Sequence, residues 1–395
     1  MSRKIWVNLF FVFTTIFFGI NQFLGSGPDV NRMPFYCAFG AYAVFFAIYF
    51  IFHFGTSYIS PPAKVSVVLT SLAAITFFFS RSYWHLYTML YGIIFTSVII
   101  FVETSLKYRS VSHKQFIKGV SFLLATSFIL TFFQSASSEE TLRYGIGINQ
   151  SCILGLPWIF MLKGWKQRIM FLAALIIAVF SGKRSAIIIF ALLPSIYIAY
   201  GGIVNPAKRT RNFIAGIGIF AVGLILFLVA DHLSGGGISD RFSGEALRNG
   251  SGRGESLQAG ISAIKNMSFS EFFLGLESDS MSAAIEDGYL GHNEVLGYML
   301  SNGLIGLLLY SLLPIVLIWR FWTLHQQKSQ MAVIYLCCVA ALGVLSLVSG
   351  VFAPNPAAII WCSFFGLVEG IWKYRRDLLL VKNLSDFLPP NKYPR

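Results

Sequence analysis

Two adjacent cations, Lys183 and Arg184, stand in the segment 181–185 between two apolar runs. An arginine presents a planar fork of N–H groups that fits phosphate oxygens, and the unpaired N–H groups at the start of a helix also favour an anion. The segment therefore predicts an anion-binding site at the mouth of a helix. The alternative is that both side chains reach out to lipid phosphates at the membrane surface.

A second cationic segment, 251–256, places Arg253 between two glycines and next to Glu255. Glycine lets the backbone and the guanidinium approach a ligand closely. We expect Arg253 to contact an anion, with Glu255 and Arg241 as candidate substrate-binding residues nearby. The alternative is a solvated charge in a loop. The segment is not a phosphate-binding P-loop, because the GxxxxGK[ST] spacing is absent.

The third candidate is His292, which precedes Asn293 and has Asp287 and Glu294 as neighbours. An imidazole takes up and releases a proton near neutral pH, so His292 or a neighbouring carboxylate could remove a proton from an incoming hydroxyl group. Asn293 is a candidate substrate-binding residue. A purely structural histidine is the alternative.

Arg143 is a fourth candidate, in a segment that also contains Glu139 and Glu140. It is assigned to substrate binding, and the alternative is an ion pair with one of these glutamates. The nearest approach to a metal motif is the pair Glu277 and Asp279, which lacks the ligand number and spacing of a metal site. We therefore expect no metal and no other cofactor.

The composition indicates which elements must position these residues. The 395-residue chain is 56% hydrophobic and only 12% charged, whereas a soluble fold carries about a quarter of charged residues. Apolar runs of about 20 residues, each long enough to span a bilayer as a helix, recur along the whole chain. The five cysteines lie in or beside these runs, which argues against a disulfide framework or a zinc site. The sequence therefore predicts an all-α polytopic membrane protein.

Charged residues and Gly, Pro and Asn clusters divide the apolar runs into about twelve membrane helices. Their predicted ranges are 5–24, 34–54, 64–80, 83–103, 115–133, 148–162, 168–181, 184–201, 212–231, 295–319, 331–350 and 356–372. We expect one helical membrane domain over 1–372, interrupted by a large outer loop over 232–290, and a basic tail over 373–395.

The outer loop is long enough to be functional. Leu257, Ile261 and Ile264 recur in it at helical spacing and predict a short amphipathic helix lying over the bundle.

The distribution of Lys and Arg sets the expected orientation. If both termini are cytoplasmic, 21 of the 30 Lys and Arg residues fall in cytoplasmic segments, among them Arg320. Glu103 and Glu369 are assigned to the same side. The outer side, with the loop 232–290, is then net acidic. The net charge of +13 thus reflects topology and contact with membrane lipids, so nucleic-acid binding is not needed to explain it.

Together these features resemble the bacterial O-antigen polymerase and O-antigen ligase superfamily. The resemblance is carried by His292-Asn293, nine residues, and then Gly303, Gly306, Leu307 and Tyr310, after an outer loop with Arg253 and after Ser-Gly-Lys-Arg at a helix mouth. It implies a C-type integral-membrane glycosyltransferase that acts on the periplasmic side of the bacterial inner membrane without a metal. On this pattern His292, Arg253 and Arg184 are the catalytic residues.

The resemblance also implies the ligands and partners. The donor would be an oligosaccharide on undecaprenyl diphosphate, and a chain-length regulator and a flippase of the same pathway would be partners. Two arginines would stabilise the leaving diphosphate. As a polymerase the enzyme transfers the growing glycan to another lipid-linked repeat unit, and as a ligase it transfers the glycan to the lipid A core. We favour the polymerase.

A transporter or lipid flippase is the alternative from another class. Such proteins carry ionisable residues or broken helices at mid-membrane depth. The sequence places its charges near the span ends, which argues against transport.

Overall fold

The computed structural model describes residues 3–23, 33–53, 59–80, 83–108, 112–137, 155–180, 184–204, 209–233, 239, 253–276, 293–327, 329, 331–348 and 357–387. All regular secondary structure in these ranges is α-helical. The helices are α1 (Arg3–Phe23), α2 (Met33–His53), α3 (Pro61–Ser80), α4 (Tyr83–Lys107), α5 (His113–Ser137), α8 (Trp165–Phe180), α9 (Arg184–Val204), α10 (Arg209–Leu233), α12 (Arg253–Lys265), α13 (Phe269–Leu274), α15 (Glu294–Gln326), α16 (Met331–Val348) and α17 (Ala357–Phe387). A further helical stretch covers 155–161.

The helices lie where the hydropathy pattern predicts them, and their length and composition fit a membrane protein. Of the described residues, the stretches Pro61–Phe78, Phe213–Leu233 and Glu294–Gln326 are long and apolar enough to cross a membrane. Shorter apolar stretches occur in four other helices. Two helices extend well past their predicted ends, since α15 continues past 319 to Gln326 and α17 continues past 372 to Phe387. The beginning of the predicted basic tail is therefore helical.

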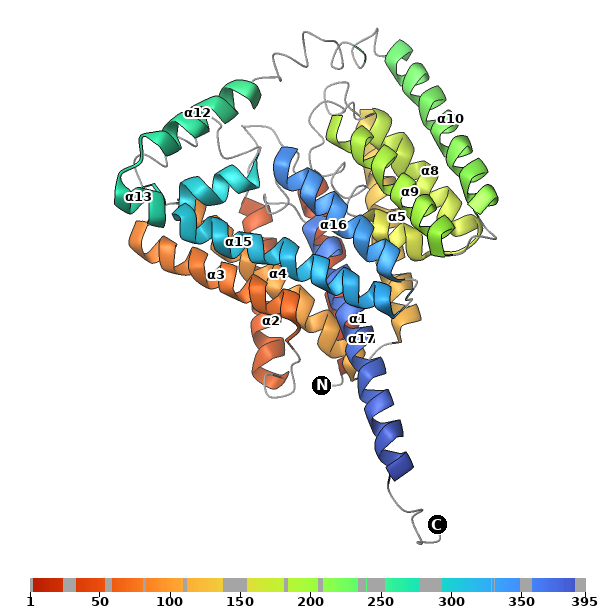
Figure 1. Ribbon diagram of the computed structural model, residues 1–395, viewed down its shortest axis with the longest axis horizontal. Coiled ribbons are helices and arrows are strands. Elements are labelled where there is room, and N and C mark those ends of the chain that lie inside the picture. Colours follow the sequence, from red (N-terminus) through yellow and green to blue (C-terminus); the bar gives the residue numbers. More distant parts are fainter. Residues whose placement is uncertain are drawn as a thin grey trace.

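Helices α3, α4, α15 and α17 form the centre of the molecule (Figure 1). Close contact between α4 and α17 depends on Gly366 and Gly370, which lie four residues apart on one face of α17. A Cβ atom at these positions would lie 2.8 Å from the carbonyl oxygen of Ile99 and 2.9 Å from that of Glu103. Small residues at this spacing let two membrane helices approach at backbone distance. This contact brings Glu103 and Glu369 into the same part of the bundle.

The large number of aromatic residues is used for packing. Phe10, Tyr42, Phe46 and Phe101 form one buried cluster between α1, α2 and α4, with ring centroids 5.1–6.5 Å apart. Such contacts are typical of offset or edge-to-face aromatic pairs.

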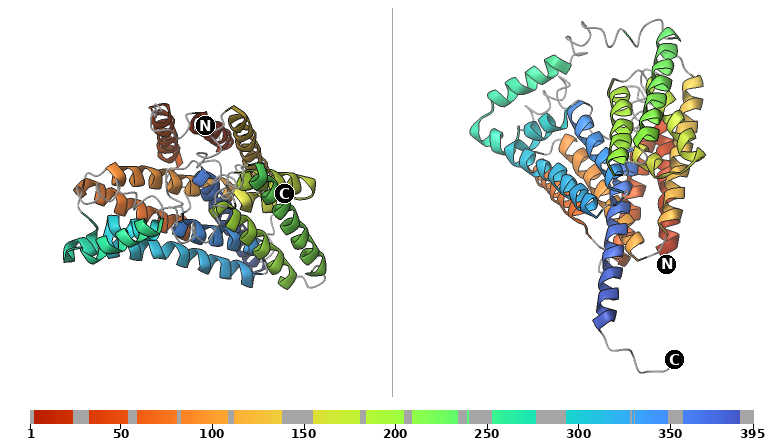
Figure 2. Two further views of the ribbon diagram at one scale, coloured as in Figure 1. Left: turned by 90° about the horizontal axis from the view of Figure 1, so that it is seen from above. Right: turned by 45° about the vertical axis from the view of Figure 1, so that its right-hand side comes forward.

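Helix α1 begins and helix α17 ends on one side of the molecule, while α12 and α13 lie toward the opposite side (Figure 2, right). Helix α10 stands at the edge, against α8 and α9. Most of its apolar side chains are exposed, including Phe213 and Phe220. A helix that is apolar on its exposed face matches a hydrocarbon environment rather than water.

Candidate functional site

The helix α15 begins directly after the predicted catalytic histidine. Asn293 is its N-cap, in extended conformation, and its side-chain oxygen accepts a hydrogen bond from the Leu296 N–H at 3.0 Å. Asparagine is favoured at this position because it satisfies one of the free N–H groups of the first turn. The structure therefore gives Asn293, predicted to bind substrate, a helix-capping contact.

Glu294, in the first turn of α15, has a buried and well-defined environment. Its side chain is 9% exposed. Oε2 accepts hydrogen bonds from the Tyr310 hydroxyl at 2.9 Å and from the Ser346 hydroxyl at 3.2 Å. The two hydroxyl groups are 2.6 Å apart, so α15 and α16 share one network. The start of a helix is a favourable place for a carboxylate.

The motif glycine Gly303 marks a break in α15. Its backbone angles are φ 62° and ψ −162°, which disfavour residues with a Cβ atom. A Cβ atom there would lie 2.3 Å from the carbonyl carbon of Phe273. Because the two backbones are this close, the Leu276 N–H can donate a hydrogen bond to the Leu300 carbonyl at 2.7 Å. Gly303 is therefore needed where the end of α13 contacts α15.

Helix α13 is fixed locally by a capping box. Ser268 caps the helix, and the Glu271 carboxylate accepts hydrogen bonds from the Ser268 N–H at 2.9 Å and its hydroxyl at 2.8 Å. These hydrogen bonds, the backbone one above all, lower the pKa of Glu271 from its ordinary value. The segment that contacts Gly303 thus has its own stabilising elements.

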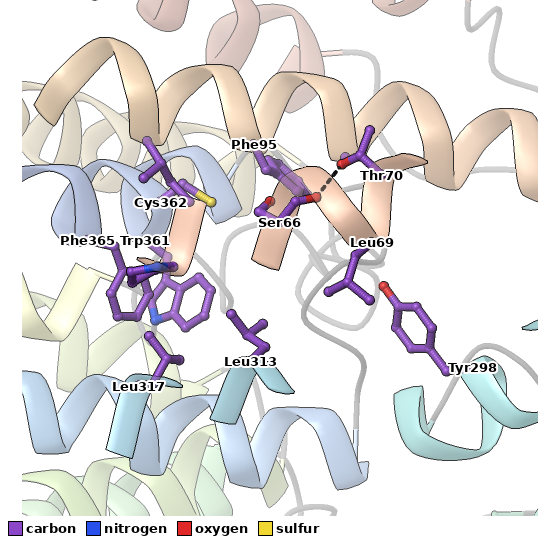
Figure 3. A pocket seen from close by; sticks show the side chains of 13 residues that line it. Ser66, Leu69, Thr70, Phe95, Tyr298, Leu313, Leu317, Trp361, Cys362 and Phe365 are labelled. Atoms are coloured by element: carbon purple, nitrogen blue, oxygen red, sulfur yellow. Dashed lines mark hydrogen bonds between the residues drawn. The ribbon is translucent and has the colours of Figure 1, made fainter. Parts of the chain in front are cut away.

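An apolar pocket lies between α3, α4, α15 and α17 (Figure 3). Trp361 and Phe365 line one end and Tyr298 lies at the other. The hydroxyl groups of Ser66 and Thr70 also line it. The Tyr298 ring stacks on Tyr310 with centroids 4.4 Å apart. The pocket is thereby connected to the Glu294 network through two stacked rings.

Helices α12 and α9 start at two of the predicted catalytic arginines. Arg253 is the first residue of α12 and Arg184 the first residue of α9. The backbone at each arginine is thus the start of a helix, where the helix dipole favours a negative charge. The side chains of Arg184, Arg253 and Glu255 lie outside the described part of the structure, as do residues Arg143, Lys183, Arg241 and His292 in full.

The helix predicted from Leu257, Ile261 and Ile264 is present as α12, but of these three residues only Ile264 packs against α15. Leu257 and Ile261 are 44% and 42% exposed. Ala263 and Met267 join Ile264 in the contact with Leu296 and Leu300. Gly260 allows this contact, since a Cβ atom there would meet Leu296 at 2.4 Å. The helix thus approaches α15 along its glycine-containing side.

Comparison with known proteins adds no family. No protein-family model matches this sequence, and no curated protein matches it. In the described ranges, no three His, Cys, Asp or Glu side chains are grouped as metal ligands. The resemblance to the O-antigen superfamily therefore rests on the motif residues.

Two groups are more prominent in the structure than their positions in the sequence indicate. In the sequence, Glu294 is a neighbour of His292, and Tyr310 is the last residue of the motif. Both are buried in one hydrogen-bonded network. A buried carboxylate two residues after a histidine is a useful signal for such a site.

Proposed function

We propose that this protein is an integral-membrane glycosyltransferase that polymerises lipid-linked oligosaccharide repeat units. The donor is a glycan on undecaprenyl diphosphate, and the acceptor is a second lipid-linked repeat unit. The observation that carries the proposal is the arrangement around α15. Helix α15 follows His292 and Asn293, its Glu294 is buried against Tyr310, and it breaks at Gly303. These motif residues therefore belong to one helix and its N-cap.

The chemistry would use residues from three helices. Negative charge develops on the diphosphate as the bond to the sugar breaks, and Arg184 and Arg253 at the starts of α9 and α12 would stabilise it. His292 would take the proton of the acceptor hydroxyl as that oxygen attacks the sugar carbon. Glu294 would fix the start of α15 beside it.

The pocket next to Tyr298 supports a lipid-linked donor. Its wall is formed mainly by apolar side chains such as Leu69, Phe95 and Leu317. Part of an isoprenoid chain would meet an apolar lining there, because ligand pockets are lined mainly by apolar side chains with a few polar groups.

The proposed topology follows from the charge pattern. The helices comprise twelve spans in the bacterial inner membrane, both termini are cytoplasmic, and the site faces the periplasm. The position of the start of α1 and the end of α17 on one side, and of α12 on the other, agrees with this arrangement.

The acceptor distinguishes the polymerase from the ligase. Purified protein supplied only with undecaprenyl-diphosphate repeat units, in the presence of EDTA, should form a ladder of longer lipid-linked glycans. A product that forms only when lipid A core is added would assign the protein to the ligases. Loss of activity in EDTA would contradict the metal-independent mechanism.

A further inference from the structure

Three charged side chains that the sequence assigned to cytoplasmic segments lie inside the helix bundle. Arg320 of α15 is 1% exposed, and Glu369 of α17 and Glu103 of α4 are each 0% exposed. The assignment of these three residues to cytoplasmic segments is therefore wrong, because their side chains do not reach water. A buried charge is costly unless it is paired, and ionisable groups within membrane helices are often functional.

Arg320 and Glu369 form a pair of opposite charges. Arg320 Nε and Nη2 donate to the two carboxylate oxygens of Glu369 at 2.5 Å and 2.6 Å. The Trp372 ring lies 4.0 Å from the guanidinium carbon. This bidentate geometry uses both oxygens of Glu369, so Glu369 is the counter-ion of Arg320.

Glu103 has no such counter-ion. Its Oε1 accepts one hydrogen bond, from the Ser60 N–H at 3.0 Å. In the described part of the chain nothing donates to its Oε2, which is fully buried, and nothing accepts from the remaining Nη1 of Arg320. An ionised carboxylate with one unsatisfied oxygen has a much larger desolvation cost at such a buried position than a neutral carboxyl group has.

The groups around Glu103 leave the balance of charge clear. Glu369 and Arg320 are within electrostatic range of it, and the buried hydroxyl of Tyr335 on α16 faces the same pair. Ser60 is neutral and acts on Glu103 through its N–H group and its side-chain hydroxyl. One positively charged guanidinium therefore faces two carboxyl groups. The cluster has no net charge when one of the two carboxyl groups is protonated and the other is ionised.

The cluster lies one helical turn from partly exposed residues. Lys107 follows Glu103 by one helical turn on α4, and Lys373 follows Glu369 by one turn on α17; both are partly exposed. One turn is about 5.4 Å along a helix. On the other side, Ile99, Leu317 and Phe365 line the apolar pocket one turn away. The cluster thus lies between the end of the pocket and the side where α1 begins and α17 ends.

We propose that Glu103, Arg320 and Glu369 form a proton-binding site, in which Glu103 carries the proton and Glu369 is ionised against Arg320. The proton exchanges with water on the side where α1 begins and α17 ends. Loss of the proton places a second negative charge between α4 and α17 and weakens their packing. This site is independent of the proposed glycosyl transfer.

Labelling with dicyclohexylcarbodiimide tests the protonation state, because this apolar reagent reacts with neutral carboxyl groups in apolar surroundings. In the purified full-length protein we expect labelling of Glu103 and not of Glu369, located by peptide mass spectrometry. The labelling should decrease as the pH rises. Labelling of Glu369 in preference to Glu103 would overturn the assignment.

Unfolding as a function of pH provides a second test that does not depend on reagent access. The folded protein holds a proton on Glu103, whereas the unfolded chain releases this proton above the ordinary glutamate range. Stability should therefore fall as the pH rises, and the unfolding constant should increase by up to about tenfold per pH unit. Glu103→Gln should keep the wild-type midpoint at low pH and lose this dependence. Glu369→Gln should lower the midpoint by several degrees, and the exposed control Glu271→Gln should leave the dependence in place.

Two results would contradict the proposal. The first is a Glu103→Gln variant that is destabilised as much as Glu369→Gln, because both carboxyl groups would then be ionised partners of Arg320. The second is an unchanged pH dependence in Glu103→Gln. The second result does not require Glu369→Gln to fold, because it compares Glu103→Gln with wild type.

Discussion

Glu294 and Tyr310 face each other across the break at Gly303, and Ser346 joins them from α16. Because a single carboxylate oxygen accepts both hydroxyl groups, loss of either hydroxyl disturbs the whole network. The network therefore fixes the start of α15 relative to the rest of that helix. In the proposed reaction this start carries His292.

Tyr310→Phe tests this network. The variant keeps the ring that stacks on Tyr298 but removes the hydrogen bond to Glu294, and we expect a loss of about 1–3 kcal/mol of stability. Thermal unfolding in detergent measures it. Tyr298→Phe is the matched control, since it also removes one hydroxyl from the stacked pair. Equal midpoints for the two variants would show that the Tyr310 hydroxyl has no special role.

Arg253 is tested by two substitutions. Arg253→Lys should be nearly as damaging to turnover as Arg253→Ala, because an ammonium group cannot form the bidentate contact to a phosphate. A lost charge-assisted contact of about 1.5–3 kcal/mol reduces the rate by one to two decades. Lys265→Ala, at the exposed end of the same helix, is the control. Normal turnover by Arg253→Ala would remove Arg253 from the site.

Among the elements, α13 and α15 depend on each other at a backbone contact. Leu276 N–H bonds to the Leu300 carbonyl, and Gly275 and Gly303 approach the facing backbone so closely that neither tolerates a Cβ atom. The segment that contains α13 is thus held to α15 by main-chain geometry. A side chain at either glycine would separate the two elements.

Gly303→Ala should therefore detach α13. The positive φ angle alone costs about 1–3 kcal/mol for a residue with a side chain, and the contact with Phe273 adds to it. Hydrogen exchange at the Leu276 amide should become faster. Gly343→Ala in α16 is the control, because a Cβ atom there meets nothing within 4 Å. Unchanged exchange at Leu276 in Gly303→Ala would show that the contact is adaptable.

The capping box of α13 should respond to acid. The lowered pKa of Glu271 means that its stabilising effect is fully present above the ordinary glutamate pKa and is lost as the pH falls through the lowered value. The protection of the amides over 268–274, relative to the intrinsic exchange rate at each pH, should decrease in that range. In Glu271→Gln this decrease should be absent. The same acid response in this variant would assign the effect to another group.

At the scale of the whole molecule, the orientation in the membrane is the first property to measure. We expect a cysteine at position 112 to be protected from an impermeant thiol reagent in intact cells, and a cysteine at position 251 to be labelled. Ser112→Cys and Ser251→Cys would be compared in a background without the exposed Cys37. Labelling of Ser112→Cys alone would reverse the proposed topology.

The sequence predicted the helices well because long apolar runs are local features. It could not show that α10 lies at the edge with Phe220 exposed while α4 is buried, since both runs are equally apolar. It also could not show that Glu103, Arg320 and Glu369 meet, because they are brought together by close helix contacts at Gly366 and Gly370. The apolar spacing in α12 indicated a helix but not its packed face.

The sequence predicted which residue types belong to the candidate site, but it did not predict which residues contact each other there. The spacing from Asn293 to Gly303 was visible in the sequence, yet the partners of Glu294 stand 16 and 52 positions away. Such pairs depend on how α15 bends and on where α16 lies. Chain-distant hydrogen bonds of this kind require the fold.

The most direct test of the proposed function is glycan transfer by the purified protein. With undecaprenyl-diphosphate repeat units as the sole substrate, wild type and Glu271→Gln should both produce a ladder of elongated lipid-linked glycans. His292→Ala should bind the donor and produce none. A folded wild-type protein that makes no elongated product with either a repeat-unit or a lipid A core acceptor, or a His292→Ala variant with undiminished turnover, would contradict the account.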